Sequence, residues 1–283
     1  MKKPKNQGIG IVGLGSVGAA LKHTCDFYHQ DVCGYDIRGN HNWTKILDCD
    51  IVFVCVPTPE DKNRRLDCSA VDNVLERLSN KGFRGIVAIK STLRVGFMEQ
   101  ARLRYPWLRL VYCPEFLREK SRLQWTICPD RIVLAGSRED TEAILDVFTW
   151  AENAEILLMS DRSAEVAKLA HNAYIATKVS FTNEIERICN EIGANPEDVM
   201  DVVTADRRVI SREHLRPYLG PYEGKCVPKD IRELIAASKS AVLLKAVEKV
   251  NERTKKEIRS DKISSLSGSV LKQEALLDSR STY

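Results

Sequence analysis

The feature that most limits how this chain can fold is an apolar run that ends in a glycine-rich turn. Residues 8–18 read GIGIVGLGSVG, with glycines spaced as G-x-G-x-x-G, and SVGAALKHTCDFY continues with helical spacing. Gly13 permits a tight turn, Gly15 lets the backbone approach a pyrophosphate, and Gly18 allows close packing of helix on strand. A strand, this turn and a helix in succession predict a dinucleotide-binding fold.

Further apolar runs alternate with helical patterns through the first half of the chain. They are predicted to be strands and lie at residues 31–36, 49–57, 85–91, 108–114 and 131–136. The run CDIVFVCVP is nearly continuous, as expected of a strand buried on both faces of a parallel sheet. The alternation predicts an α/β fold, a doubly wound parallel sheet of the Rossmann type, over residues 1–158.

An acidic residue near the glycine turn bears on which dinucleotide binds. Asp36 ends the second predicted strand, 18 residues after Gly18. Its carboxylate can accept hydrogen bonds from a ribose 2′-hydroxyl and would repel a 2′-phosphate, so it favours NAD over NADP. Arg38 weakens that preference. A structural glycine turn beside a surface aspartate is the alternative, and the combination of motif and aspartate disfavours it.

The pattern changes to long helices in the second half. Residues 161–192 contain neither glycine nor proline, Ser160 or Asp161 can cap the start, and Gly193 suits the end. A helix of this length is unusual in a globular domain. Its broad apolar face needs cover, which predicts a homodimer formed through this helix.

Two more helices and a polar tail complete the prediction. One helix opens at Asn195-Pro196, with proline in the first turn, and another runs from about residue 230 to 258. We therefore predict an all-α central domain over residues 159–259. The serine-rich stretch 260–283 is predicted to be a mobile tail.

Composition excludes several classes of protein. A net charge of +4, from 43 basic and 39 acidic residues, is too small to indicate nucleic-acid binding. We expect no signal peptide and no membrane span, because no apolar run has the required length. The nine cysteines are odd in number and form no CxxC pair, and the histidines lack ligand spacing. We therefore expect no disulfide framework, no metal site and a reducing, cytoplasmic location.

Polar stretches follow three of the predicted strands. VPTP (56–59), KST (90–92) and PEFLREK (114–120) lie where the carboxyl edge of the sheet is expected, the edge at which such folds bind ligands. On the long helix, Lys168 and Asn172 are four residues apart and share a face. They can form an oxyanion clamp. The alternative is a pair of exposed polar residues, which spacing alone favours.

The stretch GKCVPKD at residues 224–230 holds a cysteine between two cations. Lys225 and Lys229 flank Cys226 in sequence, and Lys168 can approach it in space. Cations favour the thiolate, which is the nucleophilic form of cysteine. The alternative is a buried, inert thiol with apolar neighbours, and this is the role expected of the other eight cysteines.

Several of these stretches occur in one order over about residues 8–230. They are GLGSVG, GYD, VPTP, KST, PEFLRE, AEVAKLAHNAYIATKVSFTNEI and CVPKD. Each is weak alone, but the set resembles the UDP-glucose/GDP-mannose dehydrogenase family of nucleotide-sugar dehydrogenases. The Lys/Asn helix is also found in the wider 6-phosphogluconate dehydrogenase-like group, whereas the cysteine followed by PKD belongs to the sugar-nucleotide branch.

The resemblance implies an NAD-dependent double oxidation of a hexose C6 alcohol to a carboxylate, with UDP-glucose as the default substrate. Cys226 corresponds to the nucleophile, which forms a thiohemiacetal and then a thioester. The implied catalytic set is Cys226, Lys168, Asn172, Asp230, Glu115 and Thr92. Lys168 and Asn172 would stabilise oxyanions, and Asp230 would orient water or act as a base.

The resemblance also implies two binding sets. The NAD-binding residues would be Gly13, Leu14, Gly15, Ser16, Val17, Gly18, Asp36, Arg38, Val56, Pro57, Thr58, Ser91, Glu119 and Lys229. The nucleotide-sugar substrate would contact Phe116, Leu117, Arg118, Arg208 and Tyr222.

The sequence departs from the family pattern in two places. Family chains continue into a second Rossmann-like domain that helps to bind the nucleotide, and we expect this shorter chain to lack it. The approach to the cysteine reads YLGPYEGKC, where the family tends to a stretch of the GFGGSC kind. Two other readings therefore stay open. One is an NAD-binding homologue with little or no activity, and the other is a single-step hydroxyacid dehydrogenase of the 6-phosphogluconate type.

Overall fold

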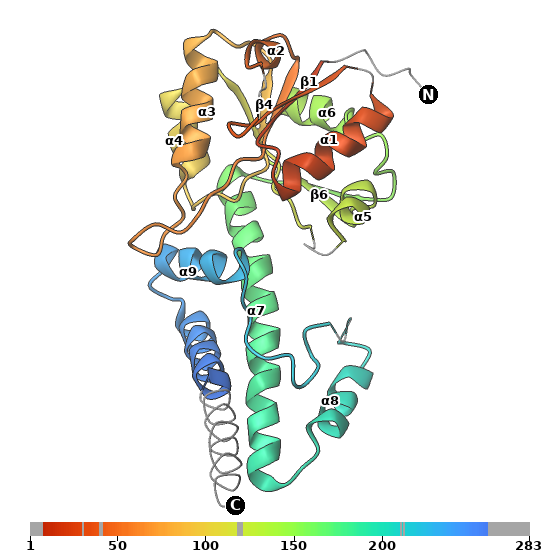
Figure 1. The fold of residues 1–283 in the computed structure, drawn as a ribbon, viewed down its shortest axis with the longest axis vertical. Helices are drawn as coiled ribbons and strands as arrows, with labels where there is room; N and C mark the ends of the chain where they lie inside the picture. Colours follow the sequence, from red (N-terminus) through yellow and green to blue (C-terminus); the bar gives the residue numbers. More distant parts are fainter. Residues whose placement is uncertain are drawn as a thin grey trace, which may run out of the picture. The chain divides into compact units, whose positions relative to one another are not determined.

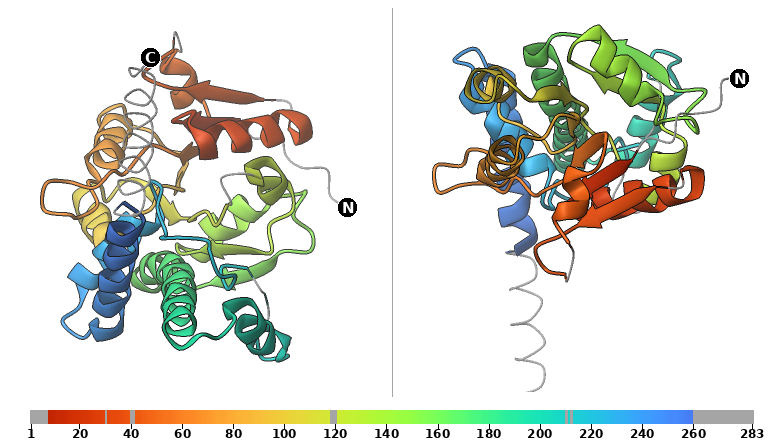
Figure 2. Two further views of the ribbon diagram at one scale, coloured as in Figure 1. Left: turned by 60° about the horizontal axis from the view of Figure 1, so that its bottom comes forward. Right: turned by 90° about the horizontal axis from the view of Figure 1, so that it is seen from above.

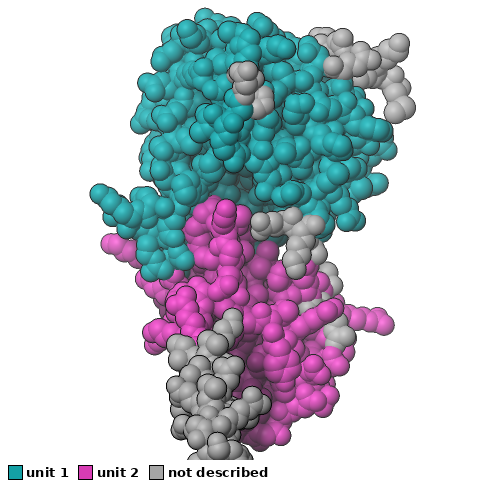
Figure 3. Space-filling view, viewed as in Figure 1, with its two compact units in different colours: residues 1–171, 232–237 teal, residues 172–231, 238–283 magenta. Residues whose placement is uncertain are grey.

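The structure is a computed structural model that describes residues 8–29, 31–39, 42–117, 121–209, 211 and 213–259. The chain forms two compact units, which Figure 3 shows in different colours. The first comprises residues 1–171 and 232–237, and the second comprises residues 172–231 and 238–283. The domain boundary expected at residue 158 stays a prediction.

A five-stranded parallel sheet forms the centre of the first unit (Figure 1). Its strands lie in the order β2-β1-β3-β4-β5. They are β1 (Ile9–Val12), β2 (Val32–Tyr35), β3 (Ile51–Val54), β4 (Ile86–Ile89) and β5 (Arg109–Tyr112). From β1, the chain places β2 on one side and β3 on the other, so the strand order reverses between β1 and β3. This arrangement confirms the predicted Rossmann-type α/β fold.

Helices cover both faces of this sheet (Figures 1 and 2). The first unit contains α1 (Ser16–Tyr28), α2 (Thr44–Leu47), α3 (Ser69–Asn80), α4 (Phe97–Arg104), α5 (Arg122–Ile127) and α6 (Arg138–Leu145). Val52 and Val54 of β3 pack in one apolar cluster with α3 and α4, whereas Ile51 and Phe53 pack in a second cluster with α1 and α6. Successive side chains of a strand point to opposite faces, so the continuous apolar run buries both.

A second, two-stranded parallel sheet was not expected. The run at 131–136 forms β6 (Arg131–Leu134), but β6 pairs with β7 (Glu155–Leu158) and does not extend the larger sheet. An antiparallel bridge between Tyr112 and Ala135 joins β5 to the segment after β6. The residues of β7 are mostly exposed, so the segment lacks the burial pattern that marks the other strands.

The long helix has the bounds that the sequence predicts. It is α7 (Asp161–Ile192), and Gly193 after it adopts a positive φ of 75°, as a C-terminal glycine cap requires. At the start, the Ser163 N–H donates to the Ser160 hydroxyl at 3.3 Å. The next helix, α8 (Pro196–Ala205), has Asn195 as its cap, whose side chain accepts from the Glu197 N–H. The predicted boundaries of the two helices are thus confirmed, and residues that cap the helix ends account for them.

The prediction of a single helix from about residue 230 to 258 is wrong. The chain forms α9 (Val227–Ala237) and, after a break at residues 238–241, a separate helix over 242–259. Residues 238–241 read SKSA, which contains neither glycine nor proline to signal the break. Among the described residues, no helix is both long and apolar enough to span a membrane. The predicted tail at 260–283 lies outside the described residues.

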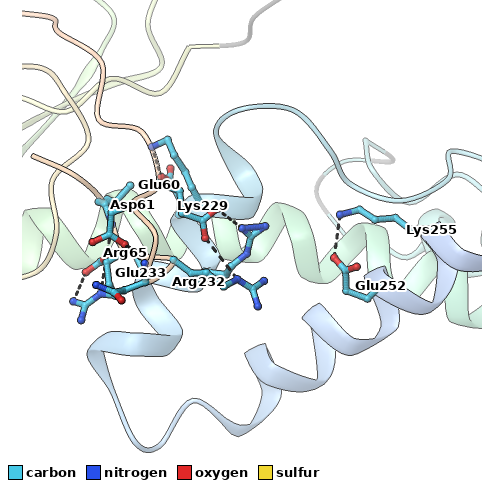
Figure 4. Close-up of polar contacts among 12 residues, drawn as sticks. Glu60, Asp61, Arg65, Lys229, Arg232, Glu233, Glu252 and Lys255 are labelled. Atoms are coloured by element: carbon cyan, nitrogen blue, oxygen red, sulfur yellow. Dashed lines mark hydrogen bonds and ion pairs between the residues drawn. The ribbon is translucent and has the colours of Figure 1, made fainter.

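The second half of α9 belongs to the first unit and is held there by two ion pairs (Figure 4). The fully buried carboxylate of Glu233 accepts from the Arg65 guanidinium at 2.7 and 2.9 Å and from the Leu66 N–H at 2.9 Å. Arg232 also pairs with Glu60, whose carboxylate is partly exposed. A buried carboxylate with three donors is well compensated, so these contacts fix residues 232–237 against the loop that follows β3.

Candidate active site

The glycine turn between β1 and α1 depends on the absence of side chains. Gly13 has a φ of +91°, and a Cβ there would lie 2.7 Å from the Cys55 carbonyl oxygen. A Cβ on Gly18 would lie 1.8 Å from the Gly13 carbonyl oxygen. Gly15 differs, because a Cβ on it would meet no atom within 4 Å. Gly13 and Gly18 are therefore needed by the fold itself, whereas Gly15 keeps a space open at the N-terminus of α1.

The polar stretches that follow β3 and β4 meet beside this turn. The Ser91 hydroxyl donates to the Val56 carbonyl at 2.7 Å, and the Val56 nitrogen lies 2.9 Å from where a Gly13 Cβ would be. Thr58 and Ser91 are buried, and Pro57 is exposed. Pro57 and Thr58 follow β3 and Ser91 follows β4, at the sheet edge beside the strand-order reversal, which is where open α/β sheets bind ligands.

Asp36 is held against the glycine turn. Its carboxylate accepts from the Leu14 N–H at 2.8 Å, from the Arg38 N–H at 2.9 Å and from the Arg38 Nε at 3.0 Å. The Arg38 side chain, its backbone N–H and the Leu14 N–H hold the pKa of Asp36 far below its usual range. The carboxylate is therefore held in its ionised form, as a hydrogen-bond acceptor beside the glycine turn.

A small cavity of about 50 Å³ opens at the carboxyl edge of the sheet in the first unit. Four predicted residues line it, Val17, Glu115, Phe116 and Leu117, together with Lys90 and Arg131, which were not predicted. The Lys90 ammonium lies 3.3 Å from the Cys113 carbonyl, and the Arg131 guanidinium lies 4.3 Å from the centre of the Phe116 ring. Lys90 is the first residue of the KST motif, so the sequence could have indicated that it lies at the site. No sequence motif contains Arg131.

Lys168 on α7 is a buried cation that pairs with Glu115. Its ammonium lies 3.4 Å from Glu115 Oε1 and 5.3 Å from the centre of the Phe116 ring, and its side chain is 5% exposed. One turn earlier, Glu165 accepts from the Gly96 and Met98 N–H groups, which fixes the start of α7 against α4. The exposed-lysine alternative is therefore wrong, because Lys168 is held inside the first unit.

A second polar cluster surrounds Asp230 in the second unit. The Asp230 carboxylate is fully buried and accepts from the Asn172 amide at 2.5 Å and from the Lys229 ammonium at 2.7 Å. Cys226 directly precedes α9, is exposed, and its carbonyl accepts from the Asp230 N–H at 3.1 Å. The positive end of a helix favours a negative group such as a thiolate. Asn172 and Lys229 together compensate the buried charge of Asp230.

Comparison with protein families identifies both parts of the chain. Residues 38–149 match the NAD binding domain of the UDP-glucose/GDP-mannose dehydrogenase family, and residues 162–253 match the central domain of the same family. The chain belongs to this family. The first match also confirms the prediction that the family's NAD-binding domain is present.

Individual members of the family agree with this assignment. The chain is 32% identical over 212 residues to UDP-glucose 6-dehydrogenase of Campylobacter jejuni, covering 72% of this chain and 53% of that protein. It is 34% identical over 235 residues to UDP-glucose 6-dehydrogenase TuaD of Bacillus subtilis, covering 78% and 50%. The chain thus spans about half the length of these relatives. A UDP-glucose dehydrogenase structure from Pyrobaculum islandicum matches with a TM-score of 0.80 and 26% identity, covering 89% of this chain and 69% of that one.

The other residues predicted from the dehydrogenase family resemblance are placed as follows. The Ser16 hydroxyl accepts from Arg122 at 3.1 Å, and Thr92 is half-buried. Arg208 is exposed and pairs with Asp206 at 2.5 Å. The Tyr222 backbone exchanges hydrogen bonds with the Asn251 side chain. Arg118 and Glu119 lie outside the described residues.

The burial of the cysteines differs in part from what the sequence led us to expect. All nine lie in the described part of the chain, and none of them forms a disulfide there. Eight were expected to be buried, but Cys128 is exposed and Cys33 and Cys49 are half-buried. Burial raises the pKa of the Cys55 thiol to about 12, as expected of a buried cysteine that acts as an apolar residue. Among the described residues, no three His, Cys, Asp or Glu side chains lie close enough together to hold a metal ion.

Proposed function

We propose that the protein oxidises the C6 alcohol of a nucleotide sugar to the carboxylate with NAD, and that UDP-glucose is its first substrate to test. The observation that carries the proposal is the cluster on α9, where an exposed cysteine at a helix start precedes a buried aspartate held by Lys229 and Asn172. Family membership and the similarity to two UDP-glucose 6-dehydrogenases support it.

The residues of the first unit fit NAD. The open space above Gly15 would take the pyrophosphate, and the ionised Asp36 would accept from the hydroxyls of the adenosine ribose. Val17 and the cavity beside Glu115 lie further along the same edge of the sheet. When bound, NAD supplies the hydride acceptor for each of the two oxidations.

The polar residues of α7 are proposed to stabilise negative charge on the substrate oxygen. Lys168 and Asn172 are four residues apart on one helix, so they project from the same face. In the first oxidation the C6 alcohol loses a hydride and a proton and becomes an aldehyde. A fixed ammonium and a fixed amide would stabilise the oxyanion that develops at each step, because they need no reorganisation.

Cys226 is proposed to provide the covalent route to the acid. Its thiolate attacks the aldehyde carbon and forms a thiohemiacetal, which loses a second hydride and a proton to become a thioester. Water then attacks the thioester carbon, which releases the carboxylate and restores the thiol. Asp230 is proposed to orient this water or to accept its proton, and the family resemblance implies that Glu115 and Thr92 assist the hydrolysis.

The proposal is tested by mixing the protein and NAD with a panel of UDP- and GDP-hexoses and following NADH. We expect two molecules of NADH for each molecule of a UDP-sugar, with UDP-glucose active. One NADH for each substrate would instead favour the single-step reaction. NAD binding by calorimetry with no NADH across the panel would favour a non-catalytic homologue and would contradict the proposal.

The proposal also includes a homodimer formed through α7. Tyr174, Phe181 and Ile188 are spaced seven residues apart on this helix and are 63%, 43% and 45% exposed. Apolar residues at this spacing form a stripe of the kind that packs against another helix. A second copy of the chain presents the same stripe, as a two-fold interface requires.

Replacing Phe181 by glutamate is expected to convert the dimer to a monomer, because the substitution places a charge at the centre of the stripe. Light scattering at micromolar concentration would report the mass. The matched control is Val202→Glu on α8, where the side chain is 75% exposed and outside the stripe. A wild-type protein that is already monomeric would refute the proposed interface.

A further inference from the structure

Two half-buried cysteines meet at the edge of the main sheet. Cys33 lies on β2, the edge strand, and Cys49 lies two residues before β3. Their sulfur atoms are 3.4 Å apart, although the residues are 16 positions apart in sequence. Both are partly exposed to solvent. Small reagents can therefore reach a pair of thiols that are already in contact.

The neighbouring strand leaves room for this contact. Gly10 on β1 pairs with Cys33 across the ladder. A Cβ on Gly10 would lie 3.1 Å from Cys49 Sγ and 3.2 Å from both Ile46 Cδ1 and Val52 Cγ2. Glycine weakens the interior of a strand and marks places where another group approaches closely. Here the Cys49 sulfur shares the space with the ends of the Ile46 and Val52 side chains.

The surroundings make the two sulfurs chemically unequal. Both thiols lie close to the Lys45 carbonyl oxygen, at 3.5 Å from Cys33 and 3.2 Å from Cys49. A hydrogen bond from Cys49 lowers the pKa of Cys33, and the charges of Lys45 and Lys22 act in the same direction, whereas burial and Asp31 oppose them. The same hydrogen bond and burial raise the pKa of Cys49. This order of pKa values favours Cys33 as the attacking thiolate and Cys49 as the resolving thiol.

We propose that Cys33 and Cys49 form a reversible redox pair that small disulfides such as oxidised glutathione convert to an intramolecular disulfide. The Cys33 thiolate attacks one glutathione sulfur, which forms a mixed disulfide and releases a glutathione thiolate. Cys49 loses its proton and attacks the Cys33 sulfur, which releases the second glutathione. In total two protein thiols are oxidised and one glutathione disulfide is reduced to two thiols.

The disulfide would close the part of the chain that carries Asp36 and Arg38. Both residues lie between Cys33 and Cys49, and Asp36 holds the glycine turn through the Leu14 N–H. A crosslink across this segment restricts the unfolded chain and stabilises the folded one. The proposal does not depend on the proposed reaction, because it concerns thiols outside the catalytic set.

The test treats the full chain with oxidised glutathione, blocks remaining thiols under denaturing conditions, and maps peptides by mass spectrometry. We expect one crosslinked pair of peptides containing Cys33 and Cys49, two fewer blocked thiols, and full reversal by dithiothreitol. The midpoint of thermal unfolding should rise by about 5 °C on oxidation. Crosslinks that involve other cysteines, or no loss of thiols, would overturn the proposal.

Single substitutions distinguish the two roles. Cys49→Ser should accumulate a stable glutathione adduct on Cys33, because the resolving thiol is gone. Cys33→Ser cannot form the crosslink, and its Cys49 should acquire a glutathione adduct more slowly than Cys33 does in the Cys49→Ser protein. Cys128→Ser removes an exposed thiol elsewhere in the first unit and should form the Cys33–Cys49 crosslink as wild type does. Equal adduct formation at Cys128 and at Cys33 in the Cys49→Ser protein would show that the pair has no special reactivity and would count against the proposal.

Discussion

Replacing Cys226 by alanine is expected to abolish formation of the carboxylate while the protein stays folded and binds NAD. The side chain is exposed at the start of α9, so its removal leaves no buried cavity. Loss of the nucleophile removes the covalent route, and we expect the rate of acid formation to fall on the order of 10³-fold or more. NADH production with UDP-glucose and calorimetry with NAD are the two measurements.

Cys128→Ser is the matched control for this variant, because it removes another exposed thiol that lies outside the proposed catalytic set. It should keep wild-type activity. If Cys226→Ala still produced acid at a rate near that of the wild type, the covalent mechanism would be wrong. If the wild type and Cys226→Ala both produced only one NADH for each substrate molecule, the single-step alternative would be favoured.

The glycine turn allows a sharper separation of folding from binding. Gly15→Ala should fold as wild type, because its φ of −74° suits any residue and its Cβ would meet no atom within 4 Å. It should nevertheless weaken NAD binding at least about tenfold, or ~1.4 kcal/mol, because the methyl group occupies the space proposed for the pyrophosphate. Gly18→Ala should instead lower the free energy of unfolding by about 3 kcal/mol, since its Cβ would lie 1.8 Å from a backbone oxygen.

Urea unfolding gives the stabilities of the two glycine variants, and NAD titration gives their affinities. The two substitutions add the same methyl group three positions apart, so each serves as the control for the other. Wild-type NAD affinity in a folded Gly15→Ala protein would place the pyrophosphate elsewhere. A Gly18→Ala protein as stable as wild type would contradict the packing described for the turn.

The parts of the fold that the sequence predicts correctly are those with a local physical cause. The five strands of the main sheet are short apolar runs, and β1, β3 and β4 are buried on both faces, which requires such runs. The glycine turn is fixed by contacts that forbid a Cβ at Gly13 and Gly18. The bounds of α7 and α8 follow from caps at Ser160, Gly193 and Asn195.

The features that were missed depend on residues far apart in the chain. The break after α9 has no glycine or proline to mark it, and exposed β7 lacks a burial pattern. Arg131 joins the cavity only because β6 lies near Phe116. The same holds for the contact between Cys33 and Cys49, which no spacing rule connects. Such contacts are set by tertiary packing and leave no periodic signal.

The anchoring of Glu233 has a consequence for how the polypeptide folds as it is made. Arg65 and the Leu66 N–H emerge from the ribosome long before their acceptor, which lies more than 160 residues further along the chain. The NAD-binding unit is therefore discontinuous, and its last hydrogen bonds form only after the second unit's residues 172–231 have been synthesised. A fragment that stops at the end of α7 would expose this loop without its acceptor, so expression trials should include residues up to at least 237.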